Sequence, residues 1–254
     1  MRQLNIFALE KIPLIIPGDN LAKIIFNALK KSKLVIQDGD VFVIAQKIVS
    51  KAENRYVTLS EILPSKKASV LAQKTDKDPR LVELILRESK KVVRFRKGVI
   101  VVEHKLGFIH ANAGIDRSNI ESDSLNPRVL LLPKNPDLSA QQLQKELSKF
   151  LRKKVGVIIN DSTGRAWRNG IVGIAIGCSG VSVLSDLRGQ KDLYGRTLEV
   201  TEVGIADELA SSASILMGQS NEGLPVVIIQ GLKLSNDKRG SKALLRLAKD
   251  DLFR

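Results

Sequence analysis

The sequence predicts an α+β fold in which mixed and antiparallel sheets pack against helices. Apolar residues make up 43% and charged residues 27% of the 254 positions, which is typical of a packed globular chain. Segments with strand composition and segments with helical periodicity follow one another in mixed order rather than in regular alternation. The chain has no internal repeat, and its length suffices for a sizeable core, so we expect a single unit over residues 1–254.

The first third of the chain predicts a helix, a buried strand and a second helix. Apolar side chains recur every three or four residues after Asp19, the spacing of one helix face, and Asp19 or Asn20 is the expected cap. Val41 to Ala45 reads as a buried strand. Asp78 and Pro79 predict the cap and first turn of the next helix. The inward face of that helix comprises Leu81, Leu84 and Ile85.

The middle of the chain predicts a hairpin, a helix and a strand. Val92 to Phe95 and Val99 to Val102 are short β-branched runs separated by a Lys-Gly turn, and a second subdomain over roughly residues 91–200 can begin here. Ser139 with Gln142 predicts a capping box for a helix. The strand that follows, Val155 to Ile159, is expected to end directly before Asn160 and Asp161.

The last third predicts three strands and two helices. Ile171 to Ile176, Val181 to Leu184 and Val226 to Ile229 have strand composition. Asp207 to Met217 has the composition of a helix, which Gly218 ends. The closing helix is expected from about Ser241, with Leu244, Leu245 and Ala248 facing inward.

Charge and composition exclude several classes of protein. The surplus of 41 Lys and Arg over 27 Asp and Glu, +14, favours an anionic partner, although solvated lysine-rich helix faces are the commoner explanation of such a surplus. The N-terminal apolar pieces are short and broken by charges and prolines, so we expect neither a signal peptide nor a membrane span, and a cytoplasmic protein. A single cysteine, Cys178, excludes an internal disulfide and a zinc site of several thiolates, and is expected to be a buried apolar side chain.

The familiar nucleotide and nucleophile motifs are missing. The chain has no Gly-Lys-Ser or Gly-Lys-Thr loop, and its GIVGIAIG stretch lacks the dinucleotide-binding spacing. The only histidines, His104 and His110, are too few for a histidine-rich metal centre and are expected to be structural. With so few histidines, a serine triad built on Ser162 is not expected.

The segment HANAGIDRSN is the first with a density of polar residues that indicates a site. Asp116 suits Mg²⁺ or Mn²⁺, which prefer carboxylate and amide oxygens, and Asn119 suits a hydrogen bond to a nucleotide. Gly114 allows the backbone to approach either ligand closely. Taken alone, the segment is equally typical of a tight Asx turn, with Asn112 in it.

Three later segments repeat this chemistry. NDSTGRAWRNG places Asp161 and Ser162 beside Arg165 and Arg168, a mixture that suits a nucleoside triphosphate shared between metal and guanidinium, with Trp167 expected to pack. SDLRGQKDLYGRTLEVTE alternates acids, arginines and glycines, and surface ion pairs within a turn are its simpler explanation. MGQSNEGLP offers backbone amides beyond a helix end, and by itself is typical of a plain loop.

Taken together, these segments resemble the F420 γ-glutamyl ligase family of archaeal type, the coenzyme F420-0:L-glutamate ligases. The resemblance includes IPLI from Ile12 and QKIVSKAEN from Gln46, NAGID followed by SN, and the run from Asp161 to Arg168. The later Asp-x-Arg-Gly and Gly-Arg-x-Leu elements follow in the family's order and spacing. It covers nearly the whole chain, and the combination is far more specific than any one piece.

The resemblance implies a fold of mixed α and β elements in two intertwined parts, forming one catalytic unit, and a homodimer. It also implies GTP-dependent addition of L-glutamate to F420-0, first on the lactyl carboxylate and then through a γ-linkage. An acyl phosphate is the implied intermediate, with GDP and phosphate released. Two divalent ions, Mn²⁺ or Mg²⁺, are implied, and K⁺ is a further candidate.

Matched position by position, the resemblance assigns roles to particular residues. Asp116 and Asp161 match the ligands of one metal, and Ser162 and Gln219 match those of the second. Asn119 matches a nucleotide contact. Lys51 and Arg168 are the catalytic candidates for stabilising phosphate charge. The remaining nucleotide-binding positions are Ile12, Pro13, Leu14, Ile15, Gln46, Lys47, Lys51, Met217, Gly218, Gln219, Ser220, Asn221, Glu222, Gly223 and Leu224.

Two other functions stay open from the sequence. The first is an amide-forming ligase of the same family that acts on a different acid, because no motif names the acceptor. The second is a nucleic-acid-binding protein, for which the net charge of +14 is the argument. Against it stand the lack of a helix-turn-helix, zinc-finger or RNP aromatic motif and the scarcity of Tyr and Trp.

Overall fold

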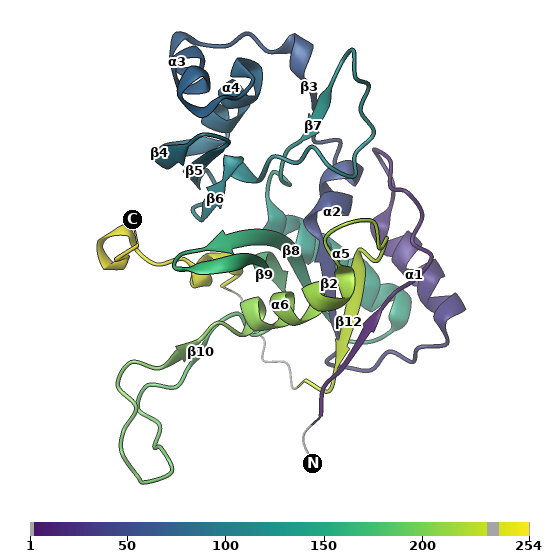
Figure 1. Ribbon diagram of the computed structural model, residues 1–254. Coiled ribbons are helices and arrows are strands. Elements are labelled where there is room, and N and C mark those ends of the chain that lie inside the picture. Colours follow the sequence, from purple (N-terminus) through teal and green to yellow (C-terminus); the bar gives the residue numbers. More distant parts are fainter. Residues whose placement is uncertain (1–2, 233–238, 254) are drawn as a thin grey trace.

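The centre of the molecule is a five-stranded sheet, seen in the computed structural model, which describes residues 3–232 and 239–253 (Figure 1). The strands run in the order β1-β12-β2-β8-β9, and only β2 and β8 pair in parallel. Their bounds are Asn5–Ala8 (β1), Val226–Gln230 (β12), Val41–Ala45 (β2), Gly156–Arg165 (β8) and Arg168–Ser179 (β9). The strands predicted at Val41, Ile171 and Val226 are therefore confirmed.

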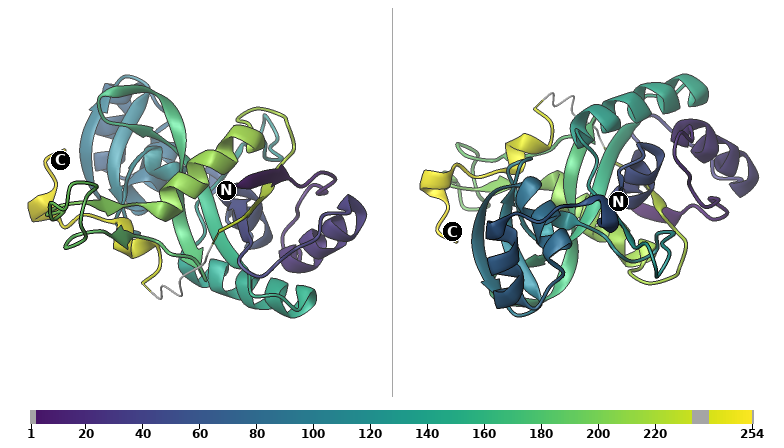
Figure 2. Two further views of the ribbon diagram at one scale, coloured as in Figure 1. Left: turned by 90° about the horizontal axis from the view of Figure 1, so that it is seen from below. Right: turned by 90° about the horizontal axis from the view of Figure 1, so that it is seen from above.

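Helices cover both faces of this sheet, which explains why β2 is apolar at every position. Phe42 and Ile44 pack into the core under α1 (Leu21–Ser32) and α5 (Pro136–Leu151). Val41 and Val43 face α6 (Ile205–Met217) on the other side. Figure 2 shows the sheet between α6 and the pair α1 and α5. Alternate side chains of one strand thus enter two separate cores.

A second unit with its own core lies above the sheet in Figure 1. The chain leaves the sheet through α2 (Gln46–Ala52), builds this unit and returns at α5. Its buried side chains lie between Leu59 and Val129. The elements are β3 (Tyr56–Thr58), η1 (Leu59–Glu61), α3 (Lys66–Thr75), α4 (Pro79–Arg87), β4 (Ser89–Arg96), β5 (Val99–His104), β6 (Ile109–Ala111), η2 (Asn112–Gly114) and β7 (Arg128–Leu130). Residues 91–200 accordingly contribute both to this second unit and to the five-stranded sheet, which contains β8 and β9.

The predicted helix starts at Asn20 and Asp78 are confirmed by their hydrogen bonds. The Asn20 side chain accepts from the backbone N–H of Lys23 at 2.8 Å and caps α1. The Asp78 side chain accepts from the N–H of Arg80, with Pro79 at the first helical position of α4. Both caps satisfy N–H groups that have no partner within their own helix.

The predicted capping box at Ser139 is wrong. Helix α5 begins one turn earlier, where the Asn135 side chain accepts from Leu138 N–H at 3.2 Å and Pro136 occupies the first position. Ser139 lies inside the helix, and its hydroxyl contacts the Glu53 carboxylate. Asn followed by Pro is the stronger start signal because proline lacks the N–H that a first-turn residue leaves unpaired.

The true cap is testable by two alanine substitutions. Asn135→Ala is expected to lower the free energy of unfolding by about 1 kcal/mol, since one first-turn N–H loses its acceptor. That corresponds to a melting temperature lower by roughly 2–4 °C in a chain of this size. Gln142→Ala should leave stability unchanged, because Gln142 is exposed and caps nothing. A larger loss of unfolding free energy for Gln142→Ala than for Asn135→Ala would instead support the capping box predicted at Ser139 and Gln142.

Two further strand predictions are also wrong. Strand β8 does not end before Asn160 but continues to Arg165, since it forms a long hairpin with β9. The segment from Val181 to Leu184 is not a strand: its valines are buried, but no strand within the described residues pairs with it, and the pair that follows is β10 (Ser185–Asp186) with β11 (Glu202–Val203). An apolar run therefore indicates burial here without sheet pairing.

The predicted closing helix is replaced by two short 3₁₀ turns, η3 (Ser241–Leu244) and η4 (Ala248–Asp250). Leu244 and Leu245 are half-buried, whereas Ala248 is exposed, so the inward face was only partly predicted. Ser241 donates hydrogen bonds to the Asp137 carboxylate of α5 and to Ile176 O of β9, which keeps this segment on the body of the molecule. Within the described residues, no helix is both long and apolar enough to cross a membrane.

Candidate active site

Strand β8 carries Asp161 to the place where the sheet meets the second unit, residues 56–130. We call this second unit the upper unit, and the place where it meets the sheet the junction. A bulge in the pairing of β8 with β9 lies at Ile159 and Asn160. Asn160 then faces α6, where its amide donates to Ser214 Oγ at 3.0 Å. Asp161, the next residue, faces β6, and its Oδ2 lies 3.0 Å from His110 Nε2. Adjacent strand residues point to opposite faces, so Asp161 rather than Asn160 faces β6.

Asp116 reaches the same junction from the upper unit. Its backbone exchanges two hydrogen bonds with Leu130, at 2.9 and 3.0 Å, which fixes its position after η2. Its Oδ2 accepts from Gln46 Nε2 at 2.7 Å, and its Oδ1 lies 3.5 Å from Lys47 Nζ. Burial raises the pKa of Asp116, Lys47 opposes that rise, and the negative charge of Asp161 adds to it. The two carboxylates predicted as ligands of one ion therefore interact electrostatically.

His110 belongs to this site, which the prediction of a purely structural histidine missed. Burial lowers the pKa of His110, but the adjacent Asp161 carboxylate outweighs that effect and raises it. The other ring nitrogen, Nδ1, is 2.9 Å from Ala111 O, so each ring nitrogen lies close to an oxygen. One signal was present in the sequence: His110 opens the segment HANAGIDRSN in which Asp116 was chosen.

His104 is structural, as predicted. Its Nδ1 accepts from Leu106 N–H at 3.0 Å, and its ring stacks on Phe108 at 5.2 Å. Burial, with nearby His110 and Lys105, lowers the pKa of His104 to about 4. It is therefore neutral near pH 7 and does not add charge to the site.

The predicted second pair, Ser162 and Gln219, is also brought together. Ser162 Oγ lies 2.8 Å from Gln219 Oε1, although the two residues are 57 positions apart. Helix α6 ends at Met217, and Gly218 (φ 69°) turns the chain into the loop that carries Gln219. The same loop meets the upper unit, since Asn119 Nδ2 donates to Ser220 O at 2.6 Å.

Helix α2 adds positive charge beside the carboxylates. Lys47 and Lys51 stand one turn apart on this helix. Lys47 Nζ donates to Ser118 O at 3.0 Å. Burial and the neighbouring Lys47 lower the pKa of Lys51, while Asp116 raises it, which places Lys51 among the same groups. Two lysines next to two carboxylates suit a ligand that carries both phosphate and metal.

The other residues predicted to bind nucleotide or phosphate lie in three separate segments. Ile12 to Ile15 pack beside α1, where Ile15 is buried and Leu14 is 90% exposed. In the loop from Met217 to Leu224, the first residue is buried, Gly218 and Leu224 are half-buried, and residues 219–223 are exposed. Arg168 is exposed at the tip of the β8–β9 hairpin, paired across the turn with Arg165, and has no ion pair among the described residues.

One smaller prediction is corrected by the structure: Trp167 does not pack, because it is 87% exposed in the hairpin turn. Gly114 lies against Leu132, since an added Cβ would lie 2.8 Å from the Leu132 side chain. Asn112 serves the fold, since its Oδ1 accepts from Ile100 N–H at 3.1 Å.

The third polar segment is explained by ion pairs, the simpler of its two interpretations. Residues 185–203 form an arm that projects from the body (Figure 1). In this arm Arg188 lies 2.6 Å from Asp186 and 3.3 Å from Glu202. Exposed pairs of this kind contribute little to stability, and here they leave no cluster of acids for a metal.

The donor set at the junction fits Mg²⁺ or Mn²⁺ rather than a metal held by protein alone. Among the described residues no three His, Cys, Asp or Glu side chains form a group that can hold a metal ion. The junction offers instead two coupled carboxylates, Asp116 and Asp161, and the oxygens of Ser162 and Gln219. Mg²⁺ commonly takes one or two carboxylates and completes its shell with water and substrate phosphates.

Comparison with known proteins shows the family of this chain. The family model described as F420-0:Gamma-glutamyl ligase matches residues 10–231. A relative named coenzyme F420:L-glutamate ligase, from Methanocaldococcus jannaschii, is 45% identical and covers 100% of this chain and 98% of its own. Relatives of the same name from Methanothermobacter thermautotrophicus and Methanococcus maripaludis are 44% and 46% identical, over 99% of this chain and 99% and 98% of theirs. The chain therefore belongs to the F420-0:Gamma-glutamyl ligase family of enzymes.

Proposed function

We propose that this enzyme adds L-glutamate to coenzyme F420-0 at the expense of GTP. The names of its relatives support the ligation of glutamate to F420. The observation that carries the rest is the meeting of four chain segments at one junction. Asp116, Asp161, the lysines of α2 and the loop after α6 combine carboxylate, ammonium and amide groups around one place.

Each part of a metal–nucleotide complex has a complementary group at this junction. Asp116 and Asp161 would hold one divalent ion, and the oxygens of Ser162 and Gln219 a second. When bound, such ions neutralise charge on the phosphates of the nucleotide. Lys47 and Lys51 would bind phosphate oxygens directly, and Asn119 would orient the nucleotide while it holds the loop at Ser220.

The proposed reaction has two steps. An oxygen of the acceptor carboxylate attacks the γ-phosphorus of GTP, the bond to the β-phosphate oxygen breaks, and GDP leaves with an acyl phosphate formed. The amine of glutamate then attacks the acyl carbon, phosphate leaves, and the amine proton is released as the amide forms. The same chemistry applies first to the lactyl carboxylate and then to a γ-carboxylate. Lys51 is the residue best placed to offset charge that develops on the transferred phosphate.

A turnover experiment tests this proposal. The purified chain is incubated with GTP, Mn²⁺, L-glutamate and F420-0, and the products are examined by mass spectrometry for glutamate-sized mass increments. Parallel reactions with ATP, or without metal, show whether GTP and the ion are required. Binding of GTP without any glutamate added to F420-0 would contradict the substrate assignment and favour an amide-forming ligase for another acid.

A further inference from the structure

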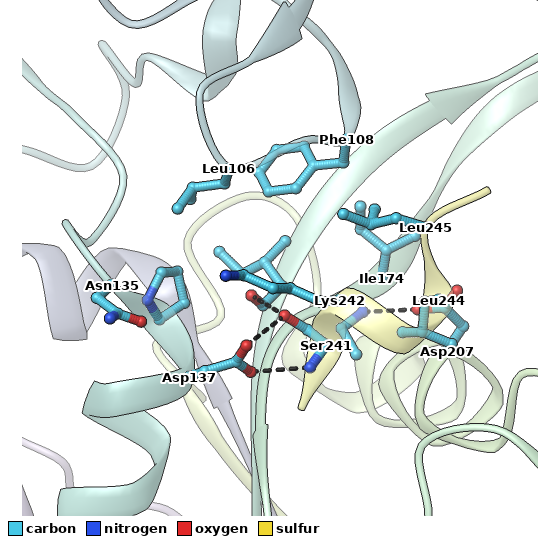
Figure 3. A pocket seen from close by; sticks show the side chains of 13 residues that line it. Leu106, Phe108, Asn135, Asp137, Ile174, Asp207, Ser241, Lys242, Leu244 and Leu245 are labelled. Carbon is cyan, nitrogen blue, oxygen red and sulfur yellow. Dashed lines mark hydrogen bonds between the residues drawn. The ribbon is translucent and has the colours of Figure 1, made fainter. Parts of the chain in front are cut away.

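A pocket of about 180 Å³ lies beside β9, next to the junction (Figure 3). Its walls come from the hairpin loop at Leu106 and Phe108, the start of α5, strand β9 and the C-terminal segment at Lys242 and Leu245. None of the residues assigned above to metal or nucleotide lines it. The volume suits a ligand much smaller than a nucleotide, since pockets for drug-sized ligands are about 300–1,000 Å³.

Asp207 gives one side of the pocket a negative charge. Its Oδ1 accepts from Ala175 N–H at 2.8 Å, which ties the carboxylate to the free edge of β9. Burial raises the pKa of Asp207, because its surroundings stabilise the charged form less than water does. Within residues 3–232 and 239–253, no Lys, Arg or His forms an ion pair with it. A ligand ammonium group would supply the missing opposite charge.

Lys242 gives the opposite side a positive charge. In Figure 3 its side chain extends across the pocket toward Asn135, away from Asp207. The preceding residue is held in place, because Ser241 N–H donates to Asp137 Oδ1 at 2.9 Å and Ser241 Oγ lies 2.9 Å from Ile176 O. The described part of the chain contains no carboxylate within ion-pair distance of Lys242. Lys242 is thus available to a ligand carboxylate.

The second acid in the wall, Asp137, does not compete for a ligand. Its Oδ1 accepts from Cys178 N–H at 2.8 Å and from Ser241 N–H, and its Oδ2 lies 3.1 Å from Ser241 Oγ. A carboxylate that already accepts several hydrogen bonds gains little from a further partner. The free charges of the pocket are therefore one carboxylate and one ammonium on opposite sides, with apolar side chains between them.

The pocket adjoins the candidate active site through two aromatic rings and one strand. Phe108, in its wall, packs edge-on against His110 with ring centroids 5.9 Å apart. His110 contacts Asp161, and Ile174, also in the wall, is the β9 partner of Asp161. A ligand in the pocket would therefore lie one strand away from the carboxylates of the junction.

We propose that this pocket binds the amino-acid substrate, with its ammonium group at Asp207 and a carboxylate at Lys242. This proposal rests on the proposed function, because it assumes that L-glutamate is the amino acid used. A zwitterion matches the pair of opposite charges, and its methylene groups match the apolar wall formed by Phe108, Ile174 and Leu245. Nucleotide and amino acid would then enter from different sides of the junction.

The test is the KM for L-glutamate at saturating GTP, Mn²⁺ and F420-0. Asp207→Asn removes the charge but keeps an acceptor for Ala175 N–H, and Lys242→Met removes the ammonium at similar length. Each is expected to raise the KM for L-glutamate about tenfold or more, with the KM for GTP unchanged. Lys242→Arg should restore most of the affinity. Glu208→Gln and Lys249→Met, exposed neighbours outside the pocket, serve as matched controls.

The outcomes separate this proposal from the proposed function. If the wild type forms product and neither variant changes the KM for L-glutamate, the pocket assignment is overturned and the function stands. The same holds if both variants raise the KM for GTP as much as the KM for L-glutamate. If the wild type forms no product, saturation-transfer NMR with L-glutamate decides. A signal lost in Asp207→Asn and Lys242→Met but kept in the controls supports the pocket. A signal that is absent from the wild type, or kept in both variants, overturns it.

Discussion

Asp161→Asn and Asp116→Asn are each expected to reduce metal-dependent turnover by about 10²–10³-fold. These substitutions keep the shape of the side chains but remove the charge that would hold a divalent ion and offset the phosphates. Asn at position 161 can still approach His110 Nε2, and Asn at position 116 can still meet Gln46, so the fold is expected to persist. The measurement is kcat for product formation across a range of Mn²⁺ concentrations.

The control for this prediction is Asp123→Asn. Asp123 is an exposed acid in the same connecting segment as Asp116, and its Oδ1 accepts from Leu125 N–H, which Asn can replace. Its turnover should equal that of the wild type. GTP with Mn²⁺ should raise the melting temperature of the wild type and of Asp123→Asn, but not of the two site variants. Full activity of Asp161→Asn would remove Asp161 from the proposed metal site. A nucleic-acid-binding protein would instead bind as well or better after losing one negative charge.

Gly177→Ala is expected to destabilise the protein by about 2–3 kcal/mol, because β9 lies against the start of α5 at this point. An added Cβ would lie 2.4 Å from Pro136 O and 2.5 Å from Pro136 C, and these backbone atoms belong to the first turn of the helix. The conflict cannot be relieved by turning a flexible side chain. The melting temperature should fall by roughly 5–10 °C in thermal unfolding without ligands.

The matched control is Gly164→Ala, in the hairpin partner of the same strand. An added Cβ at Gly164 has no atom within 4 Å, and its backbone is not in the left-handed region. Its melting temperature should stay within about 1–2 °C of the wild type. Equal stability of Gly177→Ala and Gly164→Ala would show that β9 and α5 can separate at no cost, contrary to the packing described here. The contact at Gly177 also gives the last glycine of the GIVGIAIG stretch a packing role.

The fold was predictable wherever a signal acts over a few residues. Asn20 and Asp78 were recognisable as caps because a cap bonds to a backbone group two or three positions away. The buried strand at Val41 to Ala45 was recognisable from its unbroken apolar run. Predictions that needed knowledge of a distant partner were less accurate. Val181 to Leu184 has strand composition but pairs with no strand among the described residues. Ser241 begins a short 3₁₀ turn rather than the predicted closing helix.

The candidate site was predictable in its residues but not in its contacts. The polar segments around Asp116 and Asp161 were dense enough to be chosen from the sequence, and their common order indicated the family. His110 was missed because the carboxylate that it contacts, Asp161, lies in a different segment of the chain. Trp167 was expected to pack because tryptophan is usually buried, yet its place in a hairpin turn leaves it exposed.

The sequence by itself determined the α+β class, the starts of several helices, the polar residues of the candidate site, and the family of this protein. Only the tertiary structure decided which of those residues meet. Ser162 and Gln219 are 57 positions apart, and Asn119 and Ser220 are 101 apart. Capping and periodicity depend on neighbours within one or two turns, whereas these contacts depend on how strands pair and helices close over them. For the same reason, the pocket between Asp207 and Lys242 has no signature in the sequence.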